Sequence, residues 1–319
     1  MEFFHGTNID FVGKRLLFFV ISAVATAFGL LAVFVIGIDY GIDFRGGTEI
    51  QLTFNKTITT EQLRHTISSI GIEGAEIKSL KSGEAETRQY IIRILQSEGA
   101  ANKVFEAMEK DYPGARIPGL TKIDDVGPKI GGELKKQAFI AVFLSVIAIL
   151  LYIAFRFEFI WGLGAIIALL HDVLFTFSML VIVQKTGIIK LEVDLSMLAA
   201  MLTVIGFSVN DTVIVFDRIR ENKTKHKGMN FVKLINLSIN ETLSRTINTV
   251  LTVVMVLTTM VLFGGEVLRG FSFTMLVGII VGTYSSIYIA SSYVIWHLEK
   301  FKKMDFTTVE KNQPVKVKA

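Results

Sequence analysis

Long runs of apolar residues alternate with polar segments along the chain. A helix rises about 1.5 Å per residue, so a run of about 20 apolar residues crosses the hydrocarbon core of a bilayer. The pattern therefore predicts an α-helical polytopic membrane protein with six transmembrane helices. The predicted helices cover residues 16–36, 138–155, 160–183, 195–217, 245–263 and 271–296.

The first apolar run follows a basic pair, Lys14-Arg15, as the core of a secretory signal peptide does. The run is longer than a typical signal core, and it has no small-x-small cleavage site at its end. We therefore expect residues 16–36 to be retained as the first membrane helix, after a short N-terminal segment of residues 1–15.

Lysine and arginine residues are distributed unevenly among the polar segments. They concentrate in residues 1–15, in the loop 218–244 and in the tail 297–319, whereas the two short loops on the opposite side hold few. Basic residues favour the cytoplasmic side of a membrane. Both termini are therefore expected in the cytoplasm, and the large segment 37–137 is expected outside it.

Composition narrows the classes of function. Hydrophobic residues make up 51% of the chain, cysteine is absent, and the five histidines are not in a zinc-binding spacing. We therefore expect neither a disulfide framework, nor a metal site, nor a bound cofactor. The sequence has no nucleophile elbow, P-loop or dinucleotide-binding pattern, and its basic residues follow the membrane topology. Neither an enzyme nor a nucleic-acid-binding protein is expected.

The segment 37–137 has its own pattern of elements. Alternating apolar and polar positions predict strands, and apolar residues three or four positions apart predict helices. The predicted strands cover residues 49–55, 75–80, 89–95 and 118–126, and the predicted helices cover 60–70 and 98–110. The order β-α-β-β-α-β predicts one external α+β domain of the ferredoxin-like type between helices 1 and 2.

The loop 218–244 carries apolar residues at helical spacing between basic ones. Two interpretations stay open for it. It is either an interfacial helix that lies on the membrane surface, or a solvated connector with one helical turn docked on the bundle. The lysine-rich tail 297–319 is interpreted as a topology signal.

An acidic residue interrupts the fourth predicted helix. Asp211 lies well inside residues 195–217, where an ionised carboxylate costs about 2.5–3.5 kcal/mol on insertion scales. A chain tolerates this cost when the acid is paired, faces a wet cavity or carries protons. We interpret Asp211, with Asn210 beside it, as a transport or proton-handling site. The alternative is a buried pair that only locks helix packing.

Arg245, at the start of the fifth predicted helix, is a plausible partner for Asp211. The two side chains lie at compatible depths if the fourth and fifth helices pack antiparallel. A nearby positive charge favours the ionised acid and desolvation favours the protonated one. A change in geometry can then bind or release a proton. Arginine itself stays charged, so its role is electrostatic.

Three further polar residues in the helices are candidates for a proton relay. His171-Asp172 interrupts the third predicted helix, and it is either part of a relay or a satisfied structural pair between helices. Asp217 lies near the cytoplasmic end of the fourth helix. For Asp217, pairing with Arg218 or Arg220 is favoured over a relay role.

A stripe of small residues runs along the sixth predicted helix. Glycine, serine and alanine recur at every fourth position, at Gly278, Gly282, Ser286 and Ala290. Such stripes allow two membrane helices to approach closely. We interpret this one as a packing surface and not as a substrate site.

Four spaced motifs resemble the SecD/SecF family of protein-export membrane proteins. The family's opening signature is similar to the segment after the first helix, which contains Asp39, Gly41, Asp43, Arg45, Gly46 and Gly47. Residues 126–134 resemble its second marker. Residues 205–222 and 237–246 are similar to the fourth-helix signature of the SecF branch and to the stretch that follows it. Phe207 departs from the pattern, since the family often has tyrosine there.

The resemblance implies the architecture of the resistance-nodulation-division superfamily and a multi-pass place in the lipid bilayer of the bacterial inner membrane. It implies pairing with SecD, whose six helices supply the other half, and association with the SecYEG channel and, in many bacteria, with YajC and YidC. The family uses the proton-motive force to promote a late step in the translocation and periplasmic release of a preprotein. Its proton-conducting acid and arginine correspond to Asp211 and Arg245.

Two other functions stay open at this point. A half-transporter of the same superfamily would export lipid or small molecules, although one external domain leaves little room for a drug-sized pocket. A structural scaffold would use Asp211 only as a packing lock. Replacing Asp211 with asparagine separates proton coupling from scaffolding, and comparing preprotein export with dye efflux separates the two kinds of transport.

Overall fold

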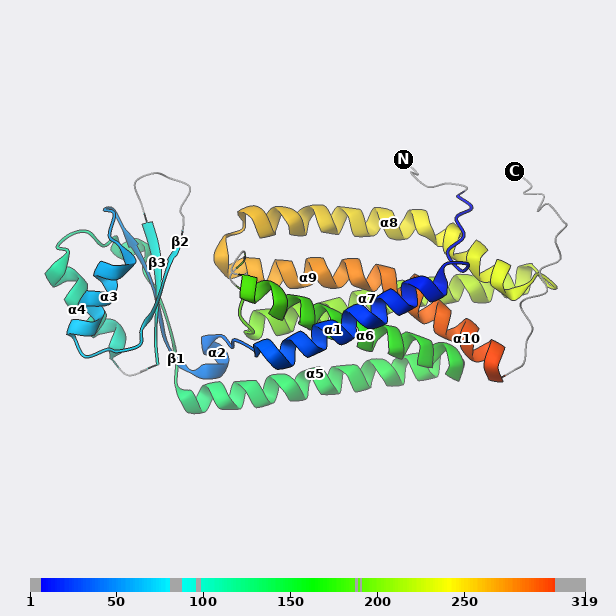
Figure 1. Cartoon of the computed structure of the whole chain (residues 1–319), viewed down its shortest axis with the longest axis horizontal. Helices are drawn as coiled ribbons and strands as arrows, with labels where there is room; N and C mark the ends of the chain where they lie inside the picture. The colour runs from blue at the N-terminus through cyan, green and yellow to red at the C-terminus, as the bar shows by residue number, and fades with distance from the viewer. Residues whose placement is uncertain (1–6, 81–87, 96–98, 187–188, 190, 302–319) are drawn as a thin grey trace. The chain divides into compact units, whose positions relative to one another are not determined.

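The chain forms two units in the computed structural model, which describes residues 7–80, 88–95, 99–186, 189 and 191–301. One unit joins Met1–Asp39 to Val142–Ala319, and the other is Tyr40–Ala141. The first is helical, and the second contains a sheet with two main helices (Figure 1). Most of the predicted tail 297–319 and the first part of the predicted segment 1–15 lie outside the described residues.

Six helices among the described residues are long and apolar enough to cross a membrane, as the sequence predicted. The first five are α1 (Arg15–Ile36), α5 (Pro128–Arg156), α6 (Phe159–Thr186), α7 (Leu195–Lys225) and α8 (Phe231–Phe263). The sixth consists of α9 (Gly265–Ser285), one π-helical turn η2 (Ser286–Ala290) and α10 (Ser291–Phe301). The chain is therefore a multi-pass helical membrane protein.

Residues 218–244 differ from the predicted loop. The helix α7 continues to Lys225 and α8 begins at Phe231, so this described stretch extends two membrane helices and forms no separate interfacial helix. Asn230 starts α8, because its side-chain oxygen accepts hydrogen bonds from the backbone N–H groups of Val232 and Lys233. The apolar residues that suggested a surface helix belong instead to the buried core of the helical unit, as Leu234, Ile235 and Ile239 show.

The helix α5 also begins earlier than its apolar run. It starts at Pro128, whereas the predicted helix starts at residue 138. Proline fits the first turn of a helix, where its missing N–H would have no partner. The lysine, glutamate and glutamine residues that follow are good helix formers. Apolar content alone marks only the part of α5 that can lie in the bilayer.

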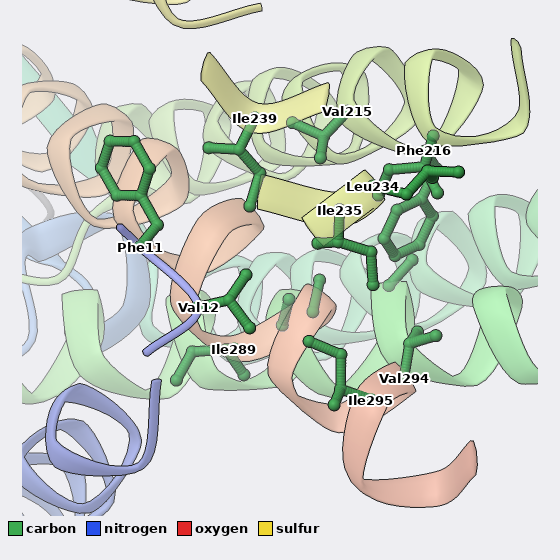
Figure 2. Close-up of a cluster of buried hydrophobic side chains, with 14 of the residues drawn as sticks. Phe11, Val12, Val215, Phe216, Leu234, Ile235, Ile239, Ile289, Val294 and Ile295 are labelled. Atoms are coloured by element: carbon green, nitrogen blue, oxygen red, sulfur yellow. The ribbon is translucent and has the colours of Figure 1, made fainter. Parts of the chain in front are cut away.

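One hydrophobic cluster joins the N-terminal segment to the last three helices. Figure 2 shows Phe11 and Val12 in this cluster, together with residues of α7, α8, η2 and α10. The residues labelled from those elements are Val215, Phe216, Leu234, Ile235, Ile239, Ile289, Val294 and Ile295. Ile235 and Val294 have no exposed surface, so the segment before α1 covers a true core.

Two asparagines of α8 hold the backbone of the same N-terminal segment. The Asn240 side chain accepts from the N–H of Ile9 and donates to its carbonyl oxygen, both at 2.9 Å. Asn236 accepts from the N–H of Phe11 at 2.8 Å. The buried backbone polar groups of an extended segment need such partners.

The small-residue stripe of the sixth helix is a packing surface, as the sequence predicted. A Cβ atom added to Gly278 would lie 2.4 Å from the side chain of Val204, and one added to Gly282 would lie 3.0 Å from the Cβ of Ser208. Both partners belong to α7. The glycines therefore allow α9 and α7 to approach more closely than larger residues would permit.

The second unit contains a four-stranded antiparallel sheet. Its strands are β1 (Gly47–Phe54), β2 (Glu76–Leu80), β3 (Arg88–Ile94) and β4 (Lys122–Val126), in the spatial order β2-β3-β1-β4. The helices α3 (Thr60–Ser69) and α4 (Ala100–Asp111) lie on one face of the sheet (Figure 1). The core between them has fully buried side chains from both layers, including Ile50, Leu52, Phe54, Ile92, Leu63, Ile67 and Val104.

The last predicted strand is shorter than expected. Residues Pro118–Leu120 form a 3₁₀ turn, η1, and β4 begins only at Lys122. Pro118 has no N–H to donate to a neighbouring strand, and its fixed φ suits the start of a turn. The predicted helix 98–110 begins at Ala100, and residue 98 lies outside the described residues.

The opening motif packs against the second family-like marker within this unit. Gly41 precedes a short helix, α2 (Ile42–Arg45), which Gly46 ends with a φ of 74°. A Cβ atom added to Gly131 of α5 would lie 3.0 Å from the backbone nitrogen of Gly46. Gly47 has a φ of 125°, and a Cβ atom there would lie 2.5 Å from the carbonyl oxygen of Ile94. These glycines are needed because backbone segments meet without room for side chains.

Candidate functional site in the membrane helices

The most buried acid in the membrane helices is Asp172 of α6, which has no exposed surface. Its Oδ2 accepts hydrogen bonds from the hydroxyls of Ser208 in α7 at 2.5 Å and Ser285 in α9 at 2.7 Å. Its Oδ1 lies 2.9 Å from Nδ1 of His171. Since a buried carboxylate needs donors to offset its desolvation, these three contacts explain how α6 carries an acid.

His171 extends this polar cluster to a fourth helix. Its Nε2 is hydrogen-bonded to the hydroxyl of Ser22 in α1. The ring stacks on Phe175, with 5.8 Å between centroids. One imidazole therefore connects the first membrane helix to the carboxylate that α7 and α9 share.

Asp211 lies in α7 on the same side as this cluster. It is half-buried, and the hydroxyl of Thr283 in α9 donates to its Oδ2 at 3.2 Å. The charges of Arg245 and Asp172 are both near enough to act on the Asp211 carboxylate. Asp211 is therefore influenced by a positive and a negative group, each on a different helix.

The predicted partnership between Asp211 and Arg245 stays a prediction, because the two side chains make no direct contact in the described part of the chain. Among the described residues, no hydrogen bond or ion pair joins the two side chains directly; Asp211 contacts Thr283 instead. Arg245 is exposed on α8, one helical turn before Thr249, whose hydroxyl donates to the Arg245 carbonyl oxygen at 3.0 Å. The sequence placed the two charges at compatible depths but could not give their separation.

The two remaining candidates of the fourth helix have different surroundings. Asn210 is exposed on α7. Asp217 accepts two hydrogen bonds from Arg156 of α5, at 3.0 and 2.9 Å. The sequence predicted that Asp217 pairs with Arg218 or Arg220, and its observed partner is instead Arg156. Arg218 bonds to Glu221 and Glu241.

Two features of the sixth helix bring its hydroxyls to both acids. Gly282 allows α9 to approach Ser208 of α7, which places Thr283 and Ser285 at the interface. The π-helical turn η2 follows directly after Ser285. Such turns are rare and frequent at functional sites, and this one lies next to the polar cluster.

The sequence did not indicate Ser22, Thr283 or Ser285 as site residues. Serine and threonine are common in membrane helices, where they bond to their own backbone, as Thr283 also does to the carbonyl of Ile279. The available signal was weak. Ser22 and Thr26 are the only residues with a hydroxyl group in the first helix, and all its other residues after Arg15 are apolar.

Asp39 of the opening motif belongs to the helical unit. Its carboxylate pairs with Lys185 of α6 at 2.9 Å, and its carbonyl oxygen accepts from Gln184 and from the N–H of Val193. Asp39, three residues after the end of α1, is therefore bound to the end of α6 and to the segment just before α7.

Within the described residues, no group of three or more histidine, aspartate or glutamate side chains could hold a metal ion. The polar cluster contains the imidazole of His171, the carboxylate of Asp172 and the hydroxyls that bond to them, and the charge of Asp172 reaches the carboxylate of Asp211. Its chemistry is suited to holding and passing protons.

Two family models match the sequence. The SecD/SecF GG motif matches residues 31–58, and the C-terminal model of the protein export membrane protein SecD/SecF matches residues 113–300. The chain is 38% identical to protein translocase subunit SecF of Petrotoga mobilis, over 93% of this chain and 98% of the relative. It is 40% identical to the SecF subunit of Calditerrivibrio nitroreducens, over 92% and 96%.

Longer relatives match this chain over part of their length. The protein translocase subunit SecDF of Bacillus subtilis is 37% identical over 92% of this chain and 39% of its own length. A crystal structure of SecDF, a translocon-associated membrane protein from Thermus thermophilus, matches with a TM-score of 0.76 and 33% identity. That match covers 91% of this chain and 39% of the SecDF chain. The chain therefore belongs to the SecD/SecF family, and it aligns with the SecF subunits over nearly their whole length.

Proposed function

We propose that this chain is an accessory subunit of the bacterial Sec translocase. Together with SecD, it uses the proton-motive force to promote late preprotein translocation and release on the periplasmic side. Family membership supports the translocase role, because the full-length relatives are translocase subunits. The observation that carries proton coupling is Asp211, half-buried in a membrane helix between the Thr283 hydroxyl and the charge of Arg245.

Protonation of Asp211 changes the contacts of three helices. The ionised acid accepts a hydrogen bond from Thr283 of α9 and attracts Arg245 of α8. When Asp211 takes up a proton, its negative charge is lost, the attraction to Arg245 disappears, and the charge-assisted hydrogen bond weakens. The helices α7, α8 and α9 then repack. Arg245 keeps its charge throughout, so it responds to the proton without carrying it.

A polar face on α8 supports pairing with SecD. Arg245, Thr249 and Thr252 recur at helical spacing, and all three are exposed in a helix that can cross the membrane. An arginine that faces lipid is costly. The helices of SecD would cover this face, and the SecDF relatives, of which this chain spans 39%, have the length for such a second half.

The wider assembly proposed here rests on the family resemblance alone. Association with the SecYEG channel, and with YajC and YidC, would place the chain where a preprotein leaves the membrane. The unit Tyr40–Ala141 would then be the external domain that contacts the preprotein. Its chain order β1-α3-β2-β3-α4-β4 and sheet order β2-β3-β1-β4 fit the ferredoxin-like type. The basic residues near the N-terminus and between α7 and α8 favour an inner-membrane orientation with both termini cytoplasmic.

The test is preprotein translocation into inverted membrane vesicles that carry the chain with SecD, with and without a proton gradient. Asp211→Asn keeps the shape of the side chain but cannot be ionised. We expect it to co-purify with SecD and to lose only the gradient-dependent part of export. Asp217→Asn is the matched control on the same helix, since Asp217 pairs with Arg156, and we expect it to keep that part.

Retention of gradient-dependent export by Asp211→Asn would show that Asp211 is not the coupling acid. Dye efflux from the same vesicles provides a second readout. If the gradient drives efflux of dyes and leaves preprotein export unchanged, the chain is a half-transporter of the same superfamily.

A further inference from the structure

The imidazole of His171 has a partner on each of its two nitrogens, and the partners belong to different helices. Nδ1 lies 2.9 Å from Oδ1 of Asp172, and Nε2 is hydrogen-bonded to the hydroxyl of Ser22 in α1. The His171 side chain is 9% exposed and the Asp172 side chain 1% exposed. This cluster is therefore nearly closed to solvent, although it contains a group that ordinarily titrates close to neutral pH.

Asp172 is fixed by its other contacts. Ser208 and Ser285 both donate to Oδ2, which leaves Oδ1 for the imidazole. A carboxylate accepts hydrogen bonds and a serine hydroxyl can either donate or accept. The imidazole is therefore the group that can be neutral or protonated. The Ser22 hydroxyl can adapt to either form, because it can donate or accept a hydrogen bond.

We propose that His171 is a second proton-exchanging group of the membrane unit, and that its protonation state sets the hydrogen bond between α6 and α1. The proposal rests on the proposed function, because it assumes that protons drive the movement of these helices. It assigns to His171 a step that Asp211 does not perform, since Asp211 contacts α9 and not α1.

The exchange moves one proton and leaves the covalent bonds of Ser22 and Asp172 unchanged. In the neutral ring, Nδ1–H donates to Asp172, and Nε2 accepts from the Ser22 hydroxyl. A proton delivered by the gradient that binds to Nε2 makes this nitrogen a donor. The Ser22 oxygen must then accept, so its hydroxyl hydrogen rotates to another acceptor. The protonated ring carries one positive charge, which the carboxylate of Asp172 balances, and release of the same proton restores the neutral ring.

The contact on α1 is part of a larger set at the same depth. The hydroxyl of Tyr284 in α9 donates to the carbonyl oxygen of Phe18 at 2.6 Å, and it also interacts with the Ser22 side chain. Tyr288 of η2 packs on Phe18, with ring centroids 4.4 Å apart. A rotation of the Ser22 hydroxyl therefore affects the contacts of α1 with both α6 and the sixth helix.

The titratable groups of this cluster and its surroundings come from four elements. Asp172 of α6 bonds to His171, and Tyr284 of α9 interacts with the Ser22 side chain. Tyr288 of η2 packs on Phe18, and the charge of Asp172 reaches Asp211 of α7. Ser208, one helical turn before Asp211, bonds to Asp172. The two proton sites are thus adjacent, and α1 leads along the chain to Asp39 and then to the second unit.

The direct test is the nuclear magnetic resonance signal of the ring nitrogens in the assembled complex with SecD in lipid vesicles. The chain has five histidines, and replacing the other four with glutamine leaves one ¹⁵N-labelled imidazole. We expect the ring signals to change between about pH 9 and pH 5, as an exchanging imidazole requires. We also expect Ser22→Ala to shift the midpoint of that change. Signals that stay constant over this range, or a midpoint that Ser22→Ala leaves unchanged, would overturn the proposal.

The second test is gradient-driven preprotein export as a function of pH. Glutamine can donate and accept hydrogen bonds but cannot bind a proton, so His171→Gln should flatten the pH profile of gradient-driven export. His65→Gln, an exposed position on α3, is the control and should keep the wild-type profile. A wild-type profile for His171→Gln would also overturn the proposal.

The two proposals fail in different ways. Gradient-dependent export by Asp211→Asn would contradict the coupling role of Asp211, whereas the spectroscopic titration of His171 does not depend on export. If His171→Gln does not assemble with SecD, the ring signals of the wild-type histidine decide the question alone.

Discussion

Gly282 of α9 and Ser208 of α7 meet where no side chain fits between the two helices. A Cβ atom on Gly282 would lie 3.0 Å from the Cβ of Ser208. The same serine donates a hydrogen bond to Asp172 of α6. The close approach of α7 and α9 therefore also brings their hydroxyls to the buried carboxylate, so helix packing and the polar site depend on the same glycine.

Replacing Gly282 with alanine should lower the thermal stability of the purified protein. The added methyl group forces α7 and α9 apart, and overpacking of this kind typically costs about 1–3 kcal/mol. Gly270→Ala is the control on the same helix, because a Cβ atom there meets nothing within 4 Å. We expect Gly270→Ala to leave the melting temperature unchanged or to raise it, since alanine favours helices. Equal melting temperatures for the two variants would show that the close contact between Gly282 and Ser208 does not determine stability.

Gly47 offers a second test, in the unit Tyr40–Ala141. Gly47→Ala places a methyl group 2.5 Å from the carbonyl oxygen of Ile94, at a φ of 125°. Gly71 also has a positive φ, 79°, but a Cβ atom there meets nothing within 4 Å. Gly71→Ala therefore measures the backbone cost alone, about 1 kcal/mol. We expect Gly47→Ala to be less stable than Gly71→Ala by at least about 1 kcal/mol in denaturant unfolding, and equal stabilities would contradict the steric argument.

Arg156 and Asp217 should show a measurable but small coupling. They join the end of α5 to α7 through two hydrogen bonds, and both side chains are about two-fifths exposed, at 38% and 41%. Exposed pairs typically contribute about 0.2–1 kcal/mol. A double-mutant cycle with Arg156→Ala and Asp217→Ala, followed by thermal unfolding, measures this value. A coupling energy of zero would mean that the ion pair does not contribute to stability.

The strongest periodic patterns predicted the fold, and the boundaries were less predictable. The six helices were found because length and hydropathy mark a membrane helix directly. The extension of the two membrane helices into residues 218–244 was not predicted, since the polar residues and basic charge of this stretch resemble those of a surface loop. What continues α7 and α8 through it is tertiary contact, including the buried hydrogen bond from Asn222 to Ser238. Such a contact pairs residues on two helices and has no local signal.

The site was predictable only in its charged members. An acid in an apolar helix stands out, so Asp211, Asp172 and His171 were all identified from the sequence. Their hydroxyl partners were not identified, because serine and threonine are common in membrane helices and can donate hydrogen bonds to backbone carbonyls of their own helix. The sequence also favoured Asp211 over Asp172, whereas the structure gives Asp172 the greater number of hydrogen bonds. Which acid is enclosed depends on how four helices meet.

The N-terminal segment should come loose when Asn236 of α8 is removed. Asn236 accepts hydrogen bonds from the backbone N–H groups of Phe11 at 2.8 Å and Val12 at 3.3 Å, and the Val12 side chain is 3% exposed. The chain has no native cysteine, so Val12→Cys provides a single thiol that should react slowly with a maleimide. Loss of a buried partner costs about 1–3 kcal/mol. If opening of the segment limits the reaction, Asn236→Ala should speed labelling roughly tenfold, which corresponds to about 1.4 kcal/mol.

Asn248→Ala is the control for this experiment, since Asn248 lies in the same helix and the described residues show no hydrogen bond from it to the segment. Labelling of Val12→Cys should then stay slow. Equal rates with and without Asn236 would mean that the hydrophobic contacts of Phe11 and Val12 hold the segment without help from the asparagine. A faster rate only in Asn236→Ala would show that backbone hydrogen bonds to α8 keep the start of the chain in the core, because a nonspecific loosening of α8 would affect both variants.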